Sequence, residues 1–77
     1  MAAELVESSN IHSREFLKGK GKNGTNKIRI VFKNGRTYEY QPVPEIVWEK
    51  REFYPSATSW FNDNLRNNKE VSAKEIK

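Results

Sequence analysis

The residues with the clearest chemical potential are cations gathered in one stretch of the chain. Residues 14–36 hold eight lysines and arginines and one acid, so this stretch carries a net charge of +7 while the rest sums to −3. Such a concentration of positive charge favours polyanionic partners, nucleic acid above all. A lysine-rich loop that only keeps a small protein in solution has the same composition. The candidate phosphate contacts are Lys18, Lys20, Lys22, Lys27, Arg29, Lys33 and Arg36.

Residue types that serve catalysis or metal binding are sparse. Residues 19–24 match the pattern GxGxxG, but a dinucleotide-binding loop needs a helix at its third glycine, and here a strand pattern follows. Thr25 stands where a Walker A loop needs lysine. His12 is the single histidine and there is no cysteine, so neither a catalytic triad nor a metal site is indicated. The sequence predicts a protein without enzymatic activity, cofactor or metal.

The role of Tyr38 and Tyr40 depends on the register of the hairpin around Asn34-Gly35. A two-residue turn sets Tyr38 opposite Val31 and gives an aromatic and basic face on which bases could stack. A three-residue turn with a bulge at Gly35 shifts the pairing by one residue and sends every side chain to the other face. The second register separates apolar from charged residues better, so we expect both tyrosines on the buried face with Ile28 and Ile30.

The elements that position these residues follow from hydrophobic periodicity. Strands are expected over residues 11–17, 27–33 and 36–41. Pro44 suits the first turn of a helix that extends to about residue 53, and Ser56 caps a second helix. The predicted fold class is α+β, a three-stranded antiparallel β-meander followed by two helices packed on one face (β-β-β-α-α). The expected core contains Phe32, Val47, Phe61 and Leu65, with Trp60 beside the apolar stripe of the second helix.

Length and composition set the organisation. We expect a weakly ordered N-terminus over residues 1–7, a single domain over residues 8–68 and a charged tail over residues 69–77. No apolar run approaches the roughly 20 residues that cross a bilayer, and the lack of cysteine fits a reducing compartment. A cytoplasmic protein with no membrane partner is therefore expected.

Taken together in order and spacing, several motifs resemble the KTSC domain, a bacterial and phage family named after the C-terminus of lysyl-tRNA synthetase. The matching residues are Ser8-Ser9-x-Ile11, Ile28-x-Ile30-x-Phe32-x-x-Gly35-x-x-Tyr38-x-Tyr40, Val43-Pro44 and Ser56-x-x-x-Trp60-Phe61-Asn62-x-x-Leu65-Arg66. The chain departs from the family at Thr58, where glycine is usual, and in the long basic loop over residues 18–24. The resemblance implies RNA binding as a suggested activity. It marks Asn62 and Arg66, four apart on one helix face, as candidate binding residues or as structural ones.

Charge and resemblance lead to a non-catalytic binding module, with RNA as the expected partner. Phosphate contacts position a nucleic acid without reading its sequence, so low sequence specificity is expected. The alternative is an adaptor or inhibitor, phage-encoded on the resemblance, whose basic face meets an acidic protein surface. In that case Trp48 or Trp60 would be exposed as an anchor. A third reading is a sponge for a small anionic ligand held between the second helix and the sheet. The oligomeric state is not predicted.

Overall fold

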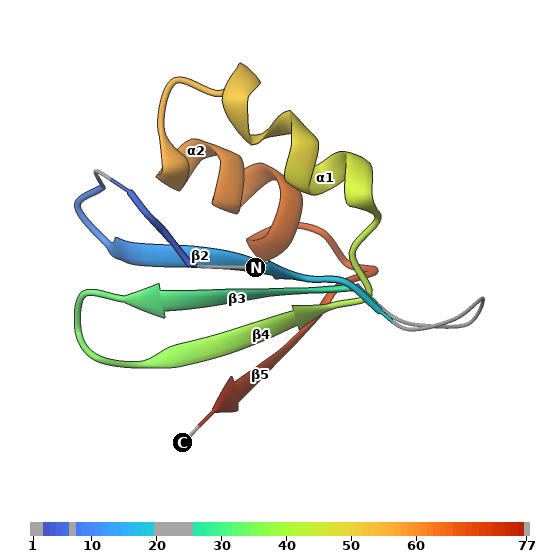
Figure 1. Cartoon of the computed structure of the whole chain (residues 1–77), viewed down its shortest axis with the longest axis horizontal. Helices are drawn as coiled ribbons and strands as arrows, with labels where there is room; N and C mark the ends of the chain where they lie inside the picture. The colour runs from blue at the N-terminus through green and yellow to red at the C-terminus, as the bar shows by residue number, and fades with distance from the viewer. Residues whose placement is uncertain (1–2, 7, 20–25, 77) are drawn as a thin grey trace.

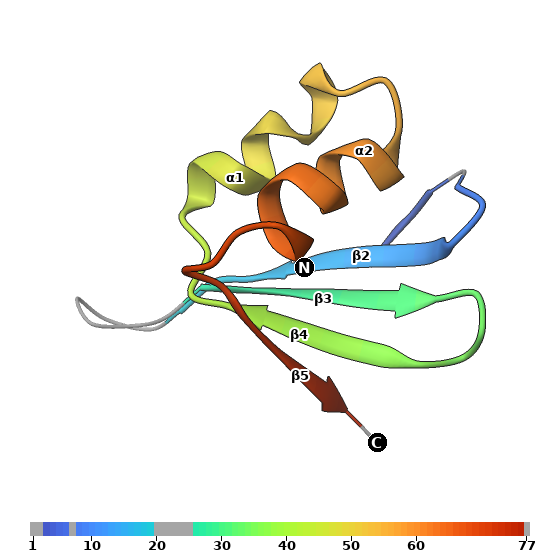
Figure 2. The ribbon, with the colours of Figure 1, turned by 180° about the vertical axis from the view of Figure 1, so that it is seen from behind.

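The computed structural model describes residues 3–6, 8–19 and 26–76. Five strands form one antiparallel sheet in the order β1-β2-β3-β4-β5. They are β1 (Glu4–Leu5), β2 (Ile11–Leu17), β3 (Lys27–Phe32), β4 (Thr37–Gln41) and β5 (Ser72–Ile76). The helical segments all lie on one face of this sheet (Figures 1 and 2). Among the described helices, none has the length and apolar character needed to span a membrane.

The predicted three-stranded meander is wrong in strand number, because the sheet has five strands. The predicted strands are β2, β3 and β4, and residues near the two ends of the chain add β1 and β5 at the edges. β1 has two residues, too few for any periodicity to show. Four of the five residues of β5 are exposed, so this strand is ordered by backbone pairing with β4 and not by burial of an apolar face. Because its side chains are mostly exposed and polar, the sequence of β5 cannot be distinguished from that of a charged tail.

Two short helical segments cover the inner face of the sheet. α1 (Glu45–Glu49) continues into the 3-10 turn η1 (Lys50–Phe53), and α2 (Ala57–Phe61) continues into the π-helical turn η2 (Asn62–Arg66). The hydroxyl oxygen of Ser56 accepts a hydrogen bond from the Ser59 backbone N–H at 3.1 Å and caps α2 as predicted. The predicted α+β class, with helices packed on one face of an antiparallel sheet, is confirmed.

The hydrophobic core lies between these helices and the sheet. Val47, Phe61 and Leu65 are buried as predicted, whereas Phe32 packs against the core while partly exposed. Trp60, which was expected beside the helical stripe, is fully buried, with an exposed fraction of 0%. Trp60 lies three residues after Ala57 and next to Phe61, so it widens the buried face of the helix. Its indole N–H donates a 2.8 Å hydrogen bond to the Val47 carbonyl oxygen, which satisfies its one polar atom.

A cluster of ion pairs and cation–π contacts ties β1 to the core. Arg14 donates to the Glu4 carboxylate at 2.8 Å, and its guanidinium lies 4.9 Å from the centroid of the Trp60 ring. Arg51 donates to the same carboxylate at 3.3 Å and lies 4.2 Å from the Trp48 ring centroid. Burial raises the pKa of Glu4, but hydrogen bonds from the two arginines outweigh it and hold that pKa below its usual range. Arg14 and Arg51 thus share one carboxylate, and the two Trp rings take up part of the remaining positive charge through cation–π contacts.

The turn between β3 and β4 confirms the bulged register. Ile30 pairs with Tyr38 and Ile28 with Tyr40, so both tyrosines share the inner face with the isoleucines. The Phe32 backbone N–H donates to the Arg36 carbonyl oxygen at 2.8 Å and leaves a three-residue loop. Gly35 has φ of +91°, which places it in the left-handed region that favours glycine. The stacking face of the two-residue turn is not formed.

Gly35→Ala is expected to destabilise the protein by about 1–2 kcal/mol through the backbone alone, because a Cβ disfavours positive φ. A Cβ built at this position has nothing within 4 Å, so no steric clash adds to that cost. Chemical denaturation measures the effect. Gly35→Asn is the matched control, since asparagine tolerates this conformation, and it should recover most of the loss. Equal stability of the alanine and asparagine variants would contradict the assigned turn.

Candidate anion-binding groove

An open groove of about 540 Å³ lies where three segments of the fold meet. One side is the helix α2–η2, another is the β3–β4 turn with the inner face of those strands, and the third is the turn that leads into β2. Of the described residues that line it, two are cationic and none is acidic. They are Ser9, Asn10, Ile11, Phe32, Lys33, Asn34, Tyr38, Tyr40, Thr58, Phe61, Asn62 and Arg66. This set gives the groove a positive and hydrogen-bonding character.

Four aromatic rings form the apolar part of the groove. Phe61 from α2 meets Phe32 and Tyr40 edge to face, with ring centroids 5.5 and 5.4 Å apart. Tyr38 meets Phe32 edge to face at 5.7 Å. These are the distances and angles that aromatic pairs prefer, so the rings hold one another in place. Tyr38 and Phe32 remain partly exposed, and their rings offer a fixed apolar surface to a ligand.

Asn62 and Arg66 line the same groove, as the predicted helix face requires. Within the described ranges, neither their side chains nor that of Lys33 takes part in a hydrogen bond or an ion pair. Arg14, Arg29 and Arg51 differ, since each is paired with a glutamate at 2.6 to 3.3 Å. A structural role that fixes Arg66 to a strand carbonyl is therefore not seen in the described part of the chain. Its guanidinium is exposed and free to meet an anion.

The hydroxyl of Tyr40 lies within the electrostatic reach of Arg66. Burial, together with the neighbouring Tyr38, raises the pKa of Tyr40 to about 12, although Arg66 acts in the opposite direction. The phenol stays protonated at neutral pH and can donate a hydrogen bond to a bound oxygen atom. The groove then combines a phenol donor, an amide, a guanidinium and an ammonium around its aromatic surface.

We expect the ultraviolet absorbance of the tyrosines to show one ionisation near pH 12 that Tyr40→Phe removes. The folded pKa lies above the usual value of about 10. The protonated state therefore contributes stability that is fully present below about pH 10 and is lost as the pH rises towards 12. Circular dichroism recorded in parallel shows whether the fold persists through that step. Completion of the whole absorbance change near pH 10 in folded protein would contradict the burial of Tyr40.

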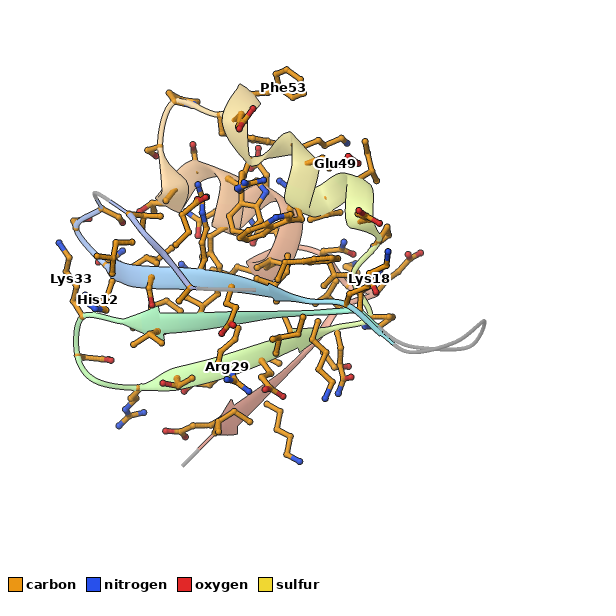
Figure 3. The ribbon with its side chains drawn as sticks, in the orientation of Figure 1. His12, Lys18, Arg29, Lys33, Glu49 and Phe53 are labelled. Carbon is orange, nitrogen blue, oxygen red and sulfur yellow. The ribbon has the colours of Figure 1, made fainter. Side chains whose placement is uncertain are left out.

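The other predicted cations do not join the groove. Lys27 and Arg29 lie on the opposite face of the sheet, where Glu39 binds both, at 3.7 and 2.6 Å. Hydrogen bonds from Arg29 hold the pKa of that buried glutamate below its usual range. Figure 3 shows Lys18 and Lys33 at opposite ends of the sheet. Arg36 is exposed on the β3–β4 turn outside the groove lining, and Lys20 and Lys22 fall outside the described residues.

The structure thus brings together Lys33, Asn62 and Arg66 and adds residues that the sequence did not single out. Tyr38 and Tyr40 were assigned to the core, yet both also line the groove. Thr58 was noted as a departure from the family, and its hydroxyl lies 2.6 Å from the hydroxyl of Ser8, which ties the turn before β2 to the start of α2. The turn before β2 contributes Ser9 and Asn10 to the groove. In the sequence, the only sign of this turn was the Ser8-Ser9 motif of the family resemblance, which did not indicate a binding site.

Comparison of the sequence with known protein families gives a match. A family model, the KTSC domain, matches residues 7–68, which is more than half of the chain. The chain belongs to the KTSC domain family. No curated protein matches it in a sequence comparison. Every residue that lines the groove lies inside the matched segment of the KTSC domain, whereas the edge strands β1 and β5 lie outside it.

Proposed function

We propose that this KTSC domain is a non-catalytic module that binds single-stranded nucleic acid, RNA in the first place, in the groove. The observation that carries the proposal is the meeting of Lys33 and Arg66, which form no ion pair among the described residues, with partly exposed aromatic rings in a groove whose described lining contains no acid. Single-strand binding proteins combine cations that follow the phosphates with aromatic side chains on which bases stack. The groove lining supplies cations in Lys33 and Arg66 and aromatic rings in Phe32 and Tyr38.

The shape of the groove supports a single strand over a duplex. Its aromatic surface lies between the helix α2–η2 and two turns, so a base can reach Tyr38 or Phe32 only after leaving a stacked helix. A volume of about 540 Å³ falls in the range that encloses a small organic ligand, enough for roughly one or two nucleotides. We therefore expect a short site in which few phosphates are contacted.

The cations of the outer sheet face have a smaller part in this proposal than the sequence suggested. Lys27 and Arg29 share Glu39, and Arg29 also lies 3.9 Å from Glu15. Their charges are balanced before any partner arrives. Lys18, Lys20, Lys22 and Arg36 would act at longer range, by attracting a polyanion towards the groove.

Fluorescence anisotropy with short labelled oligonucleotides tests the proposal. Single-stranded RNA of unrelated sequences should bind with similar affinity, and the same sequences in a duplex should bind more weakly. Binding should weaken from about 50 to about 200 mM salt, with log affinity falling by roughly 0.7 per phosphate neutralised. A nucleoside monophosphate that competes fully with RNA would favour the small-anion reading. No binding of RNA or DNA at low salt would overturn the proposal.

One observation bears on the rival function, binding to a protein. An exposed Trp48 or Trp60 was expected to mark an adaptor, but Trp60 is fully buried and Trp48 is half-buried beneath Arg51. The exposed tryptophan expected of such an interface is therefore not present among these two residues. Among the described residues, the aromatic side chain with a large exposed fraction is Phe53, on the opposite side of the helical layer from the sheet (Figure 3).

A further inference from the structure

A ridge along the outer surface of α1 and η1 exposes two large apolar side chains. Ile46 is 54% exposed and Phe53 is 84% exposed. They are seven residues apart, about two helical turns, so they lie on the same side of the continuous segment. Figure 3 shows Phe53 projecting away from the rest of the molecule. Exposed large apolar residues that line up in this way mark an interaction surface more often than isolated ones do.

The charges around these two residues are acidic. Glu45, Glu49 and Glu52 are exposed on the same segment and Lys50 is the exposed cation among them, so three negative charges against one positive give −2. Arg51 offsets part of this charge, because its guanidinium lies over the Trp48 ring and shares the Glu4 carboxylate with Arg14; with Arg51 counted, the segment still carries −1. The whole chain carries +4. The ridge is therefore a local reversal of charge on a basic protein.

The inner side of the same segment is firmly held. Val47 is buried, and the Trp48 ring stacks on Phe16 at 5.8 Å. The indole of Trp60 donates to the Val47 carbonyl oxygen at 2.8 Å. A surface fixed from behind loses little entropy when it binds, which favours affinity. Ile46 therefore lies on a braced helix, whereas η1, which carries Phe53, has no buried residue and is held on its inner side through the contacts of Arg51 with Glu4 and the Trp48 ring.

We propose that the ridge formed by Glu45, Ile46, Glu49, Glu52 and Phe53 docks a protein surface that is apolar at its centre and rich in lysine and arginine at its rim. Charge complementarity selects this partner. The acidic rim repels nucleic acid phosphates and anionic lipid headgroups, so it disfavours both as occupants. The ridge and the groove have no residue in common. The domain can then hold a polyanion and a basic protein at the same time.

Selection from a displayed library of random short peptides tests the ridge without a named partner. Peptides retained by the wild-type chain and lost on Phe53→Ser should carry an excess of lysine and arginine around leucine, phenylalanine or tryptophan. A synthetic peptide of the dominant sequence should then bind Phe53→Ser at least about tenfold more weakly, as expected for an aromatic anchor. Glu49→Lys with Glu52→Lys should weaken the same peptide and favour acidic ones.

Leu5→Ser is the matched control, because Leu5 is 73% exposed on β1 and lies off the ridge. It should leave peptide affinity unchanged, and so should saturating RNA, which separates this proposal from the function of the groove. The proposal is overturned if no peptide distinguishes wild type from Phe53→Ser, or if the selected peptides are acidic. It is also overturned if sedimentation shows wild-type self-association that Phe53→Ser abolishes, since the occupant would then be a second copy of the chain.

Discussion

Replacing Trp60 by alanine is expected to remove a large part of the protein's free energy of unfolding. Removing a buried aromatic side chain typically costs about 3–5 kcal/mol, through lost burial and the cavity left behind. The substitution also leaves the Val47 carbonyl oxygen without its 2.8 Å donor and removes the ring beneath the Arg14 guanidinium. A domain of this length has a total stability of roughly 4–11 kcal/mol. The loss is therefore comparable with everything that holds the fold together.

Thermal and chemical denaturation followed by circular dichroism measure this effect. Trp60→Phe should fall between wild type and the alanine variant, because it keeps most of the apolar volume and loses the hydrogen bond. Phe53→Ala is the surface control and should melt like wild type, since its ring is 84% exposed. A cooperative transition of Trp60→Ala within a few degrees of wild type would show that the core is assigned wrongly.

The central hairpin could be predicted because local rules determine it. Asn34-Gly35 located the hairpin, the separation of apolar from charged residues on its two strands favoured the bulged register, and the pairing of Ile30 with Tyr38 confirms it. The cap at Ser56 was equally local, since one hydroxyl oxygen satisfies one backbone N–H of the helix. In each case the residues that decide the structure are neighbours in the sequence.

The edge strands and the full burial of Trp60 could not be predicted in the same way. β5 is held by backbone hydrogen bonds to β4, and backbone pairing leaves no mark on the identity of side chains. β1 is held through Glu4, whose partners Arg14 and Arg51 lie ten and forty-seven residues away. Contacts of this kind exist only once the chain has folded. The sequence showed the charges and not their pairing.

The candidate site shows the same division. Asn62 and Arg66 share one helix face, and that spacing could be read directly, while Lys33 was one of several equivalent cations in the sequence. Only the fold distinguishes Lys33, at the rim of the groove, from Arg29, which Glu39 neutralises on the other face. Composition gives the net charge of the chain, but only the fold shows which cations are paired with acids and which are available to bind an anion. The proposed binding of an anion in the groove depends on the cations that the fold leaves available.

The largest functional effect is expected when Lys33 and Arg66 are both replaced by alanine. A hydrogen bond to a charged group contributes about 1.5–3 kcal/mol, so each single substitution should weaken RNA binding by roughly tenfold or more. The double variant should approach the product of the two effects if the residues bind different phosphates. Each replacement should also lower the salt dependence of log affinity by about 0.7, since one fewer phosphate is neutralised. Both side chains are exposed, so the melting temperature should stay at the wild-type value.

Two further variants control for charge. Arg36→Ala removes a cation from the same turn as Lys33, and Lys69→Ala removes one just beyond η2, but neither residue lines the groove. If the groove is the binding site, these controls should change affinity far less than Lys33→Ala and Arg66→Ala. Equal losses for all four variants would mean that net charge attracts RNA without a defined site. A fall in melting temperature with Arg66→Ala would instead assign that residue a structural role, because a side chain that only contacts ligand cannot stabilise the free protein.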